Sequence, residues 1–214
     1  PVFVTAAAFA ASLLLPAAMA LVSALLRRFK NADVLLTSFL VSAATIPFID
    51  SLIAGKFRGA TNNLLATPFI AERFRFSHIL NPSPLSALAL MPLALCGAAW
   101  YVKYRTVSGR RLQITGISKE FAQYCGYRQS RTLCAALAAA GAFHGLAGFI
   151  AVTGTYYTCH AGFYGGMGWN ALSCALIANS NPAMIAPASL VLSWLFTSAN
   201  RVALNNNFGF DMSS

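Results

Sequence analysis

The chain has 214 residues, of which 57% are hydrophobic and only 9% are charged. A soluble domain would carry charges at about 25% of its positions, so this composition excludes an ordinary water-soluble protein and indicates lipid as the solvent. The net charge of +10 would favour nucleic acid in a soluble protein. Here, however, the basic residues bracket apolar segments, which membrane topology explains better, and we predict no nucleic-acid partner.

Four apolar segments are predicted to span the membrane. Residues 2–26 contain no charge and carry Pro16, which would kink their helix, and residues 34–54 return through the bilayer. Residues 85–104 and 132–154 form the third and fourth predicted spans. Because an α-helix rises 1.5 Å per residue, about 20 residues cross the hydrocarbon layer.

The connections and the C-terminal part are less regular. Residues 27–33 form a polar turn, in which we expect Asn31 to cap the second helix. Residues 155–169 are rich in glycine and aromatic residues, and the two apolar helices that follow, 170–182 and 183–199, are each too short for an ordinary span. The sequence therefore predicts an all-α polytopic membrane protein with about four full spans and short or broken helices near the C-terminus.

Orientation follows from the basic residues. Segments 27–30 and 103–131 hold ten of the fifteen Lys and Arg residues, and both fall on one side when the spans alternate. The positive-inside rule makes that side cytoplasmic and residues 55–84 extracytoplasmic. We treat residues 1–214 as a single transmembrane domain with a cytoplasmic loop at 105–131.

This cytoplasmic loop contains a predicted amphipathic helix over residues 117–125. Apolar and aromatic residues recur there at helical spacing, with charged residues between them and a glycine at each end. Such a helix either rests on lipid headgroups or offers its ridge to a cytoplasmic partner. The candidate docking residues are Gly116, Ile117, Glu120, Phe121, Tyr124 and Gly126.

Small residues shape the fourth predicted span. Gly141, Gly145 and Gly148 recur on one face, which would let another helix backbone approach closely, and we interpret them as packing residues. His144 lies beside that face. An ionisable residue in a span is a candidate for substrate contact, and a neutral histidine hydrogen-bonded to a carbonyl is the alternative.

Residues 162–168 predict irregular backbone, which survives at membrane depth only where it is buried or lines a cavity. The rings of Phe163, Tyr164 and Trp169 can stack on a flat heterocycle, and the amide of Asn170 can hydrogen-bond its edge. Packing of these residues at the membrane interface explains them equally well. The candidate substrate-path residues are His144, Phe163, Tyr164, Trp169 and Asn170.

These motifs resemble a known family. "TGISKEFAQYCGY" is similar to the coupling segment of ABC-importer permeases, in the branch that moves ribose, nucleosides, riboflavin and branched-chain amino acids. "KYRTVSGRRLQITG" before it, the stretch from "AAAGAFHGLAGF" to "IANSNP" after it, and "FKNADVLLTSFLVS" upstream are similar to the same family in the same order. The matching positions of the coupling segment are Gly116, Ala122, Tyr124 and Gly126.

The resemblance implies a multi-pass permease subunit of a bacterial ABC importer in the cell (inner) membrane. A nucleoside or a heterocycle such as riboflavin is the implied substrate, with a sugar or branched-chain amino acid as an alternative. The implied partners are cytoplasmic ATPase subunits, a second permease, identical or not, and an extracytoplasmic substrate-binding protein. ATP and Mg²⁺ would be bound by the ATPase, so we expect no cofactor on this chain.

No P-loop motif, nucleophile motif or metal-ligand spacing is evident, and we predict neither catalysis nor a metal site. A non-transporting scaffold or orphan subunit is an alternative, whereas a secondary transporter is disfavoured because no buried acid–base pair is evident. Family members usually have spans before Pro1 and one after the tail, so we expect a fragment or a shortened relative.

Overall fold

The computed structural model describes residues 2–59, 65–76, 88 and 90–205. This described part is helical apart from turns and a single isolated β-bridge, between Ala66 and His160. The chain divides into two compact units, one of residues 1–92 and 103–163 and the other of residues 93–102 and 164–214.

Three membrane-length helices belong to the first unit. They are α1 (Val2–Lys30), α2 (Val34–Ala54) and α6 (Gln129–Ala151), and α6 continues as one turn of π-helix, η3 (Val152–Tyr156). Each is long and apolar enough to cross a membrane, as the sequence predicted for these segments.

The turn between α1 and α2 is capped by a different residue from the one predicted. Asp33 Oδ1 accepts hydrogen bonds from the N–H groups of Leu35 at 2.7 Å and Leu36 at 3.3 Å, whereas Asn31 adopts a left-handed φ of 51°. The prediction of Asn31 as the cap was therefore wrong by two residues. A carboxylate serves well here because it also complements the positive end of the helix dipole.

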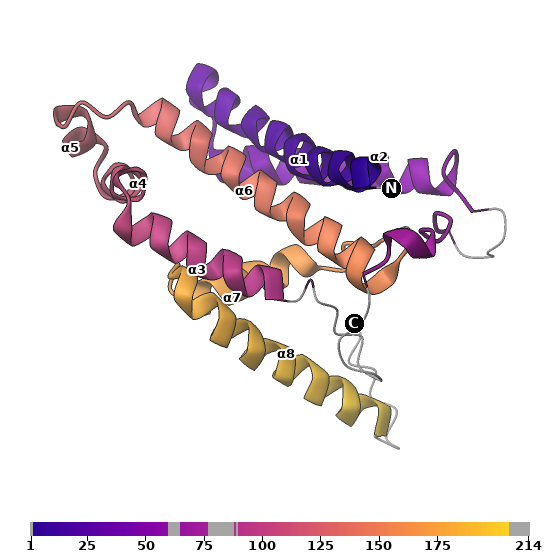
Figure 1. The fold of residues 1–214 in the computed structure, drawn as a ribbon. Coiled ribbons are helices and arrows are strands. Elements are labelled where there is room, and N and C mark those ends of the chain that lie inside the picture. The colour runs from indigo at the N-terminus through magenta and orange to yellow at the C-terminus, as the bar shows by residue number, and fades with distance from the viewer. Residues whose placement is uncertain (1, 60–64, 77–87, 89, 206–214) are drawn as a thin grey trace. The chain divides into compact units, whose positions relative to one another are not determined.

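The α1–α6 contact is the most extensive helix pair of the described chain (Figure 1). Pro16 has no N–H to bond the carbonyl of Ser12, and that carbonyl lies where a Cβ on Gly145 would stand. A Cβ on Gly141 would likewise collide with Pro16 and come within 2.8 Å of Ala17 Cα. The two backbones therefore approach as closely as only glycine allows.

The described part of the third predicted span is α3 (Leu90–Arg105), a helix of 16 residues. Residues 85–87 and 89 of that span lie outside the described residues. The structure therefore supplies four membrane-length helices only when the C-terminal helix α8 (Pro182–Asn205) is included.

In the second unit, α7 (Met167–Ile177) and α8 (Pro182–Asn205) pack around a small core. The core contains Cys174, Ala178 and Ala188. The expectation that the helix over 183–199 is too short for an ordinary span was wrong, because α8 continues to Asn205 and residues 182–202 are long enough to span a membrane. Asn200 and Arg201 are polar but helix-compatible, and neither glycine nor proline follows Pro187 within the helix, so nothing ends it at residue 199.

Candidate functional site

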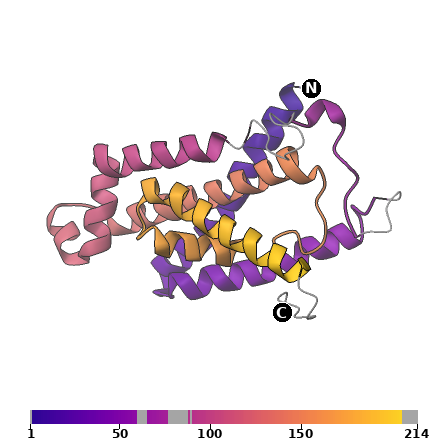
Figure 2. The ribbon, with the colours of Figure 1, turned by 90° about the horizontal axis from the view of Figure 1, so that it is seen from below.

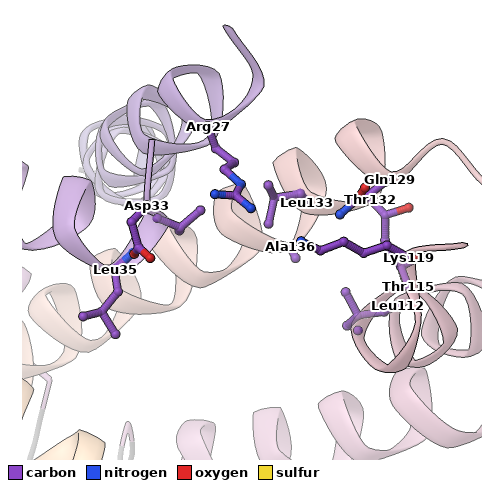
Figure 3. Close-up of a pocket in the computed structure, with 12 residues that line it drawn as sticks. Arg27, Asp33, Leu35, Leu112, Thr115, Lys119, Gln129, Thr132, Leu133 and Ala136 are labelled. Atoms are coloured by element: carbon purple, nitrogen blue, oxygen red, sulfur yellow. The ribbon is translucent and has the colours of Figure 1, made fainter. Parts of the chain in front are cut away.

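The predicted site residues of the first unit are described from its two ends. At one end, residues of the 27–35 turn and of the 112–119 segment line a common pocket with the start of α6 (Figure 3). At the other end, the Asp50 carboxylate near the end of α2 accepts a hydrogen bond of 3.0 Å from Gly162 N–H. The 21 residues of α2 rise about 31 Å between these ends. The two basic loops thus meet at one end, in agreement with the predicted alternation of spans.

The segment predicted to dock a cytoplasmic partner forms two helices, α4 (Val107–Ile117) and α5 (Lys119–Tyr124), beyond the N-terminal end of α6 (Figures 1 and 2). The prediction of one continuous helix over 117–125 was wrong, because Ser118 is extended, with φ −142° and ψ 119°. Its hydroxyl accepts a hydrogen bond of 3.2 Å from Phe121 N–H and so starts a new helix. Serine competes in this way with the backbone for local hydrogen bonds.

The end of α5 is fixed by a Schellman motif. Tyr127 N–H donates to Ala122 C=O and Gly126 N–H donates to Gln123 C=O, both at 2.9 Å. Gly126 takes the left-handed conformation that this motif requires, with φ 74°. Gly116 differs, because it lies inside α4 and a Cβ there would meet nothing within 4 Å. Only one of the two predicted bracketing glycines therefore has a conformational reason to be glycine.

Three large side chains of this segment are exposed, Ile117 at the end of α4 and Phe121 and Tyr124 on α5, and we name this predicted docking set the docking ridge. They are 87%, 57% and 91% exposed, while Ala122 on the opposite face of α5 is fully buried. Glu120 lies beside the ridge and is also exposed. Such exposed apolar side chains outside the membrane-length helices are available for burial against a partner.

At the other end, α6 gives way to an aromatic cluster. Beyond η3, Tyr157 adopts a left-handed φ of 57°, and the rings of Tyr156, His160 and Phe163 pack edge to face. Their centroids lie 5.3–5.9 Å apart. Phe163 was a predicted site residue, whereas Tyr156 and His160 were not singled out, and the aromatic richness of residues 155–169 was the available signal.

A segment from the predicted extracytoplasmic loop supports this aromatic cluster. Thr67 N–H donates to Cys159 C=O at 2.9 Å, and the Arg75 guanidinium lies 5.2 Å from the centre of the Tyr157 ring. Burial raises the pKa of the Cys159 thiol, and the nearby Asp50 carboxylate raises that pKa further. The thiol therefore stays protonated at neutral pH, which suits a structural role.

The other candidate path residues belong to the second unit or to α6. Tyr164, Trp169 and Asn170 belong to the second unit, where Trp169 occupies the first turn of α7 and is 65% exposed. In α6, His144 Nδ1–H donates to Ala140 C=O at 2.8 Å, so this ring is hydrogen-bonded to the backbone of its own helix. No cluster of three His, Cys, Asp or Glu side chains that could hold a metal ion occurs among the described residues.

The predicted packing glycines do not share one environment. Gly141 and Gly145 lie in the contact with α1, and both are buried. A Cβ on Gly148 would meet nothing within 4 Å. The close approach therefore occupies the middle of α6 and does not extend to the last of the three glycines.

Comparison with known proteins gives a family and two named relatives. The family described as "Branched-chain amino acid transport system / permease component" matches residues 3–209. The probable riboflavin import permease protein RfuC of Treponema pallidum (strain Nichols) is 32% identical over 190 residues, which cover 87% of this chain and 49% of that protein. The guanosine ABC transporter permease protein NupP of Bacillus subtilis (strain 168) is 24% identical over 132 residues, 61% of this chain and 36% of that protein.

The chain thus spans about half the length of the first relative and less of the second. No solved structure matches significantly. The matches confirm the family resemblance carried by the coupling segment and its flanking motifs.

Proposed function

The chain belongs to the permease family of branched-chain amino acid transport systems, and from this premise we propose that it forms the membrane path of an ATP-driven importer for a fused-ring heterocycle. The observation that carries the proposal is its likeness to permeases named for riboflavin and for guanosine. A flavin and a purine nucleoside both present a flat, hydrogen-bonding ring system. A nucleoside or a riboflavin-like molecule is therefore the proposed substrate class.

We infer that ATP hydrolysis is coupled to transport through the docking ridge of Ile117, Phe121 and Tyr124. Cytoplasmic ATPase subunits would bury these exposed side chains, and their ATP-driven closure would move α4 and α5 as rigid bodies. ATP and Mg²⁺ would be bound by those subunits, since the sequence has no P-loop motif. A second permease and an extracytoplasmic substrate-binding protein would complete the importer.

The proposed substrate path involves Trp169 and Asn170 in the first turn of α7. Exposed rings such as Trp169 can stack on a flat heterocycle, and the amide of Asn170 can bond the edge of its ring. His144 is the weaker candidate, because its Nδ1–H already donates to a backbone carbonyl.

A branched-chain amino acid is the second candidate substrate, favoured by the description of the family itself. Such a substrate would need a site for a carboxylate and an ammonium group rather than a stacking platform. A sugar, or a non-transporting scaffold that binds the same partner, are the remaining alternatives.

Uptake and copurification in the native host test these alternatives together. The full natural protein, tagged, should bring down a P-loop ATPase, and its deletion should abolish uptake of labelled riboflavin or guanosine while leucine uptake persists. Loss of leucine uptake alone would move the assignment to amino acids. An unchanged uptake profile with the ATPase still bound would support a scaffold instead.

A further inference from the structure

A pocket of about 440 Å³ lies in the first unit where three membrane-length helices begin or end (Figure 3). Its rim contains Arg27 from the last turn of α1, Asp33 at the cap of α2 and Gln129 at the start of α6, and α5 contributes Lys119. Because these are the ends of apolar helices, the rim lies where hydrocarbon meets water.

The rim carries an excess of positive charge. Arg27 is half-buried and its guanidinium donates to the carbonyls of Asn31 at 3.4 Å and Ala32 at 3.3 Å, which hold it in place. Figure 3 shows Lys119 reaching into the same space from α5. The carboxylate in the pocket, Asp33, is engaged by two backbone N–H groups of α2.

The N-terminus of α6 adds to this field. Its N-cap residue, Arg128, makes no side-chain capping hydrogen bond, and Gln129 and Thr132 from its first turn line the pocket. Uncapped N–H groups at a helix N-terminus attract anions. The pocket thus combines two cations from different helices with the positive end of a third.

The rest of the lining is mostly apolar. Leu35 lies in the first turn of α2, and Leu133 and Ala136 lie one to two turns into α6. An occupant that satisfies the whole pocket must therefore be anionic at the rim and apolar toward the spans. A free nucleotide or phosphate would leave the apolar part unfilled.

We propose that this pocket binds an anionic membrane phospholipid, with the phosphodiester between Arg27 and Lys119 and an acyl chain along Leu133. Basic pockets between membrane helices bind such headgroups through the same chemistry. A lipid held here would contact α5 through Lys119 and the spans through α1 and α6. It would thereby link the docking segment to the bilayer.

Native mass spectrometry of the full natural protein in a neutral detergent tests this site. Dioctanoyl phosphatidylglycerol should bind at least about tenfold more tightly than dioctanoyl phosphatidylcholine. The double variant Arg27→Gln/Lys119→Gln should lose about fivefold in phosphatidylglycerol affinity for each cation removed. The matched control Lys30→Gln/Arg110→Gln removes two exposed charges outside the pocket and should keep the preference.

A second variant keeps the test decisive if the first double variant fails to fold. Ala136→Leu fills the apolar part without changing charge and should weaken phosphatidylglycerol binding while the unfolding temperature stays unchanged. Equal loss in both double variants would show diffuse attraction to a basic surface and overturn the site. Displacement of the lipid by millimolar inorganic phosphate would overturn the lipid assignment and leave a free-anion site, and equal binding of the two lipids would overturn both.

Discussion

Two regions of the first unit use their surfaces in opposite ways. In the α1–α6 contact, Gly141 and Gly145 remove side chains so that two apolar helices touch backbone to backbone. In the α4–α5 segment, large apolar side chains are exposed instead, with Tyr124 91% exposed. The apolar spans need only lipid around them, whereas the docking ridge stands outside the spans.

This difference shows how exposure should be interpreted in a chain that is 57% hydrophobic. Exposed leucines on a span are satisfied by hydrocarbon and carry no functional information. An exposed aromatic ridge beyond the end of α6 lacks that environment, so it indicates either a protein partner or the lipid surface. The predictions below separate the internal contact from the docking ridge.

The largest effect is expected at the docking ridge. Phe121→Asp or Tyr124→Asp should abolish ATPase copurification and uptake, because truncating an aromatic anchor costs about 2–4 kcal/mol and an added charge opposes burial further. Since both residues are exposed, the unfolding temperature of the permease should not change.

Two matched variants sharpen this prediction. Val107→Asp places the same charge on an exposed apolar residue of α4 away from the ridge, and it should leave copurification intact. Glu120→Ala should weaken docking less than the aspartates do, because a rim charge sets orientation more than strength. Copurification that survives both Asp variants would mean that the ridge rests on lipid headgroups.

The second effect concerns the internal contact. Gly145→Ala should destabilise the protein by about 3 kcal/mol, because the new methyl group would meet the Ser12 carbonyl, which is backbone and cannot rotate away. Gly148→Ala makes the same chemical change in open space and should not lower the unfolding temperature. Thermal unfolding in detergent measures both, and equal behaviour of the two variants would contradict the close approach.

The sequence predicted these two regions with unequal success, for physical reasons. Long charge-free segments fix the spans, and glycines at helical spacing indicate a packing face, since both signals are local. Local signals could not separate Gly145 from Gly148, because which glycine meets the partner helix depends on the kink and tilt of that helix. The break at Ser118 was missed because the apolar spacing continues across it, although a serine three residues before Phe121 was an available capping signal.

The same limits apply to the C-terminal region and the aromatic site. The length of α8 was underestimated because the expected helix stopped at residue 199, before the polar residues Asn200 and Arg201 that α8 in fact includes. The aromatic richness of residues 155–169 did not specify the ring cluster, since Tyr156 and His160 are brought together with Phe163 by the π-helical turn and the left-handed Tyr157. Such conformations depend on neighbouring segments, here residues 67–75, rather than on the residues themselves.

The third effect tests whether an exposed ring outside the docking ridge also has a partner. Trp169→Ala should weaken binding of the heterocycle in the path by about 1–3 kcal/mol, the usual contribution of ring stacking, and should therefore lower its uptake. ATPase copurification should persist. Trp194→Ala is the matched control, because Trp194 is 69% exposed on α8 in the same unit. Labelled riboflavin and guanosine uptake measure the effect, and equal uptake by the two variants would remove Trp169 from the path.

The smallest effect is expected at the end of α5. Gly126→Ala forces a side chain into a left-handed conformation with φ 74°, at a cost of about 1 kcal/mol, and it should loosen the Schellman motif that orients Tyr124. Gly116→Ala inserts the same methyl group into α4 where nothing lies within 4 Å, and it should be neutral or slightly stabilising. ATPase affinity should therefore fall about fivefold for Gly126→Ala and stay unchanged for Gly116→Ala. If both variants bind the ATPase as the parent does, the docking ridge does not depend on the cap that ends its helix, and the orientation of Tyr124 must be set by the partner.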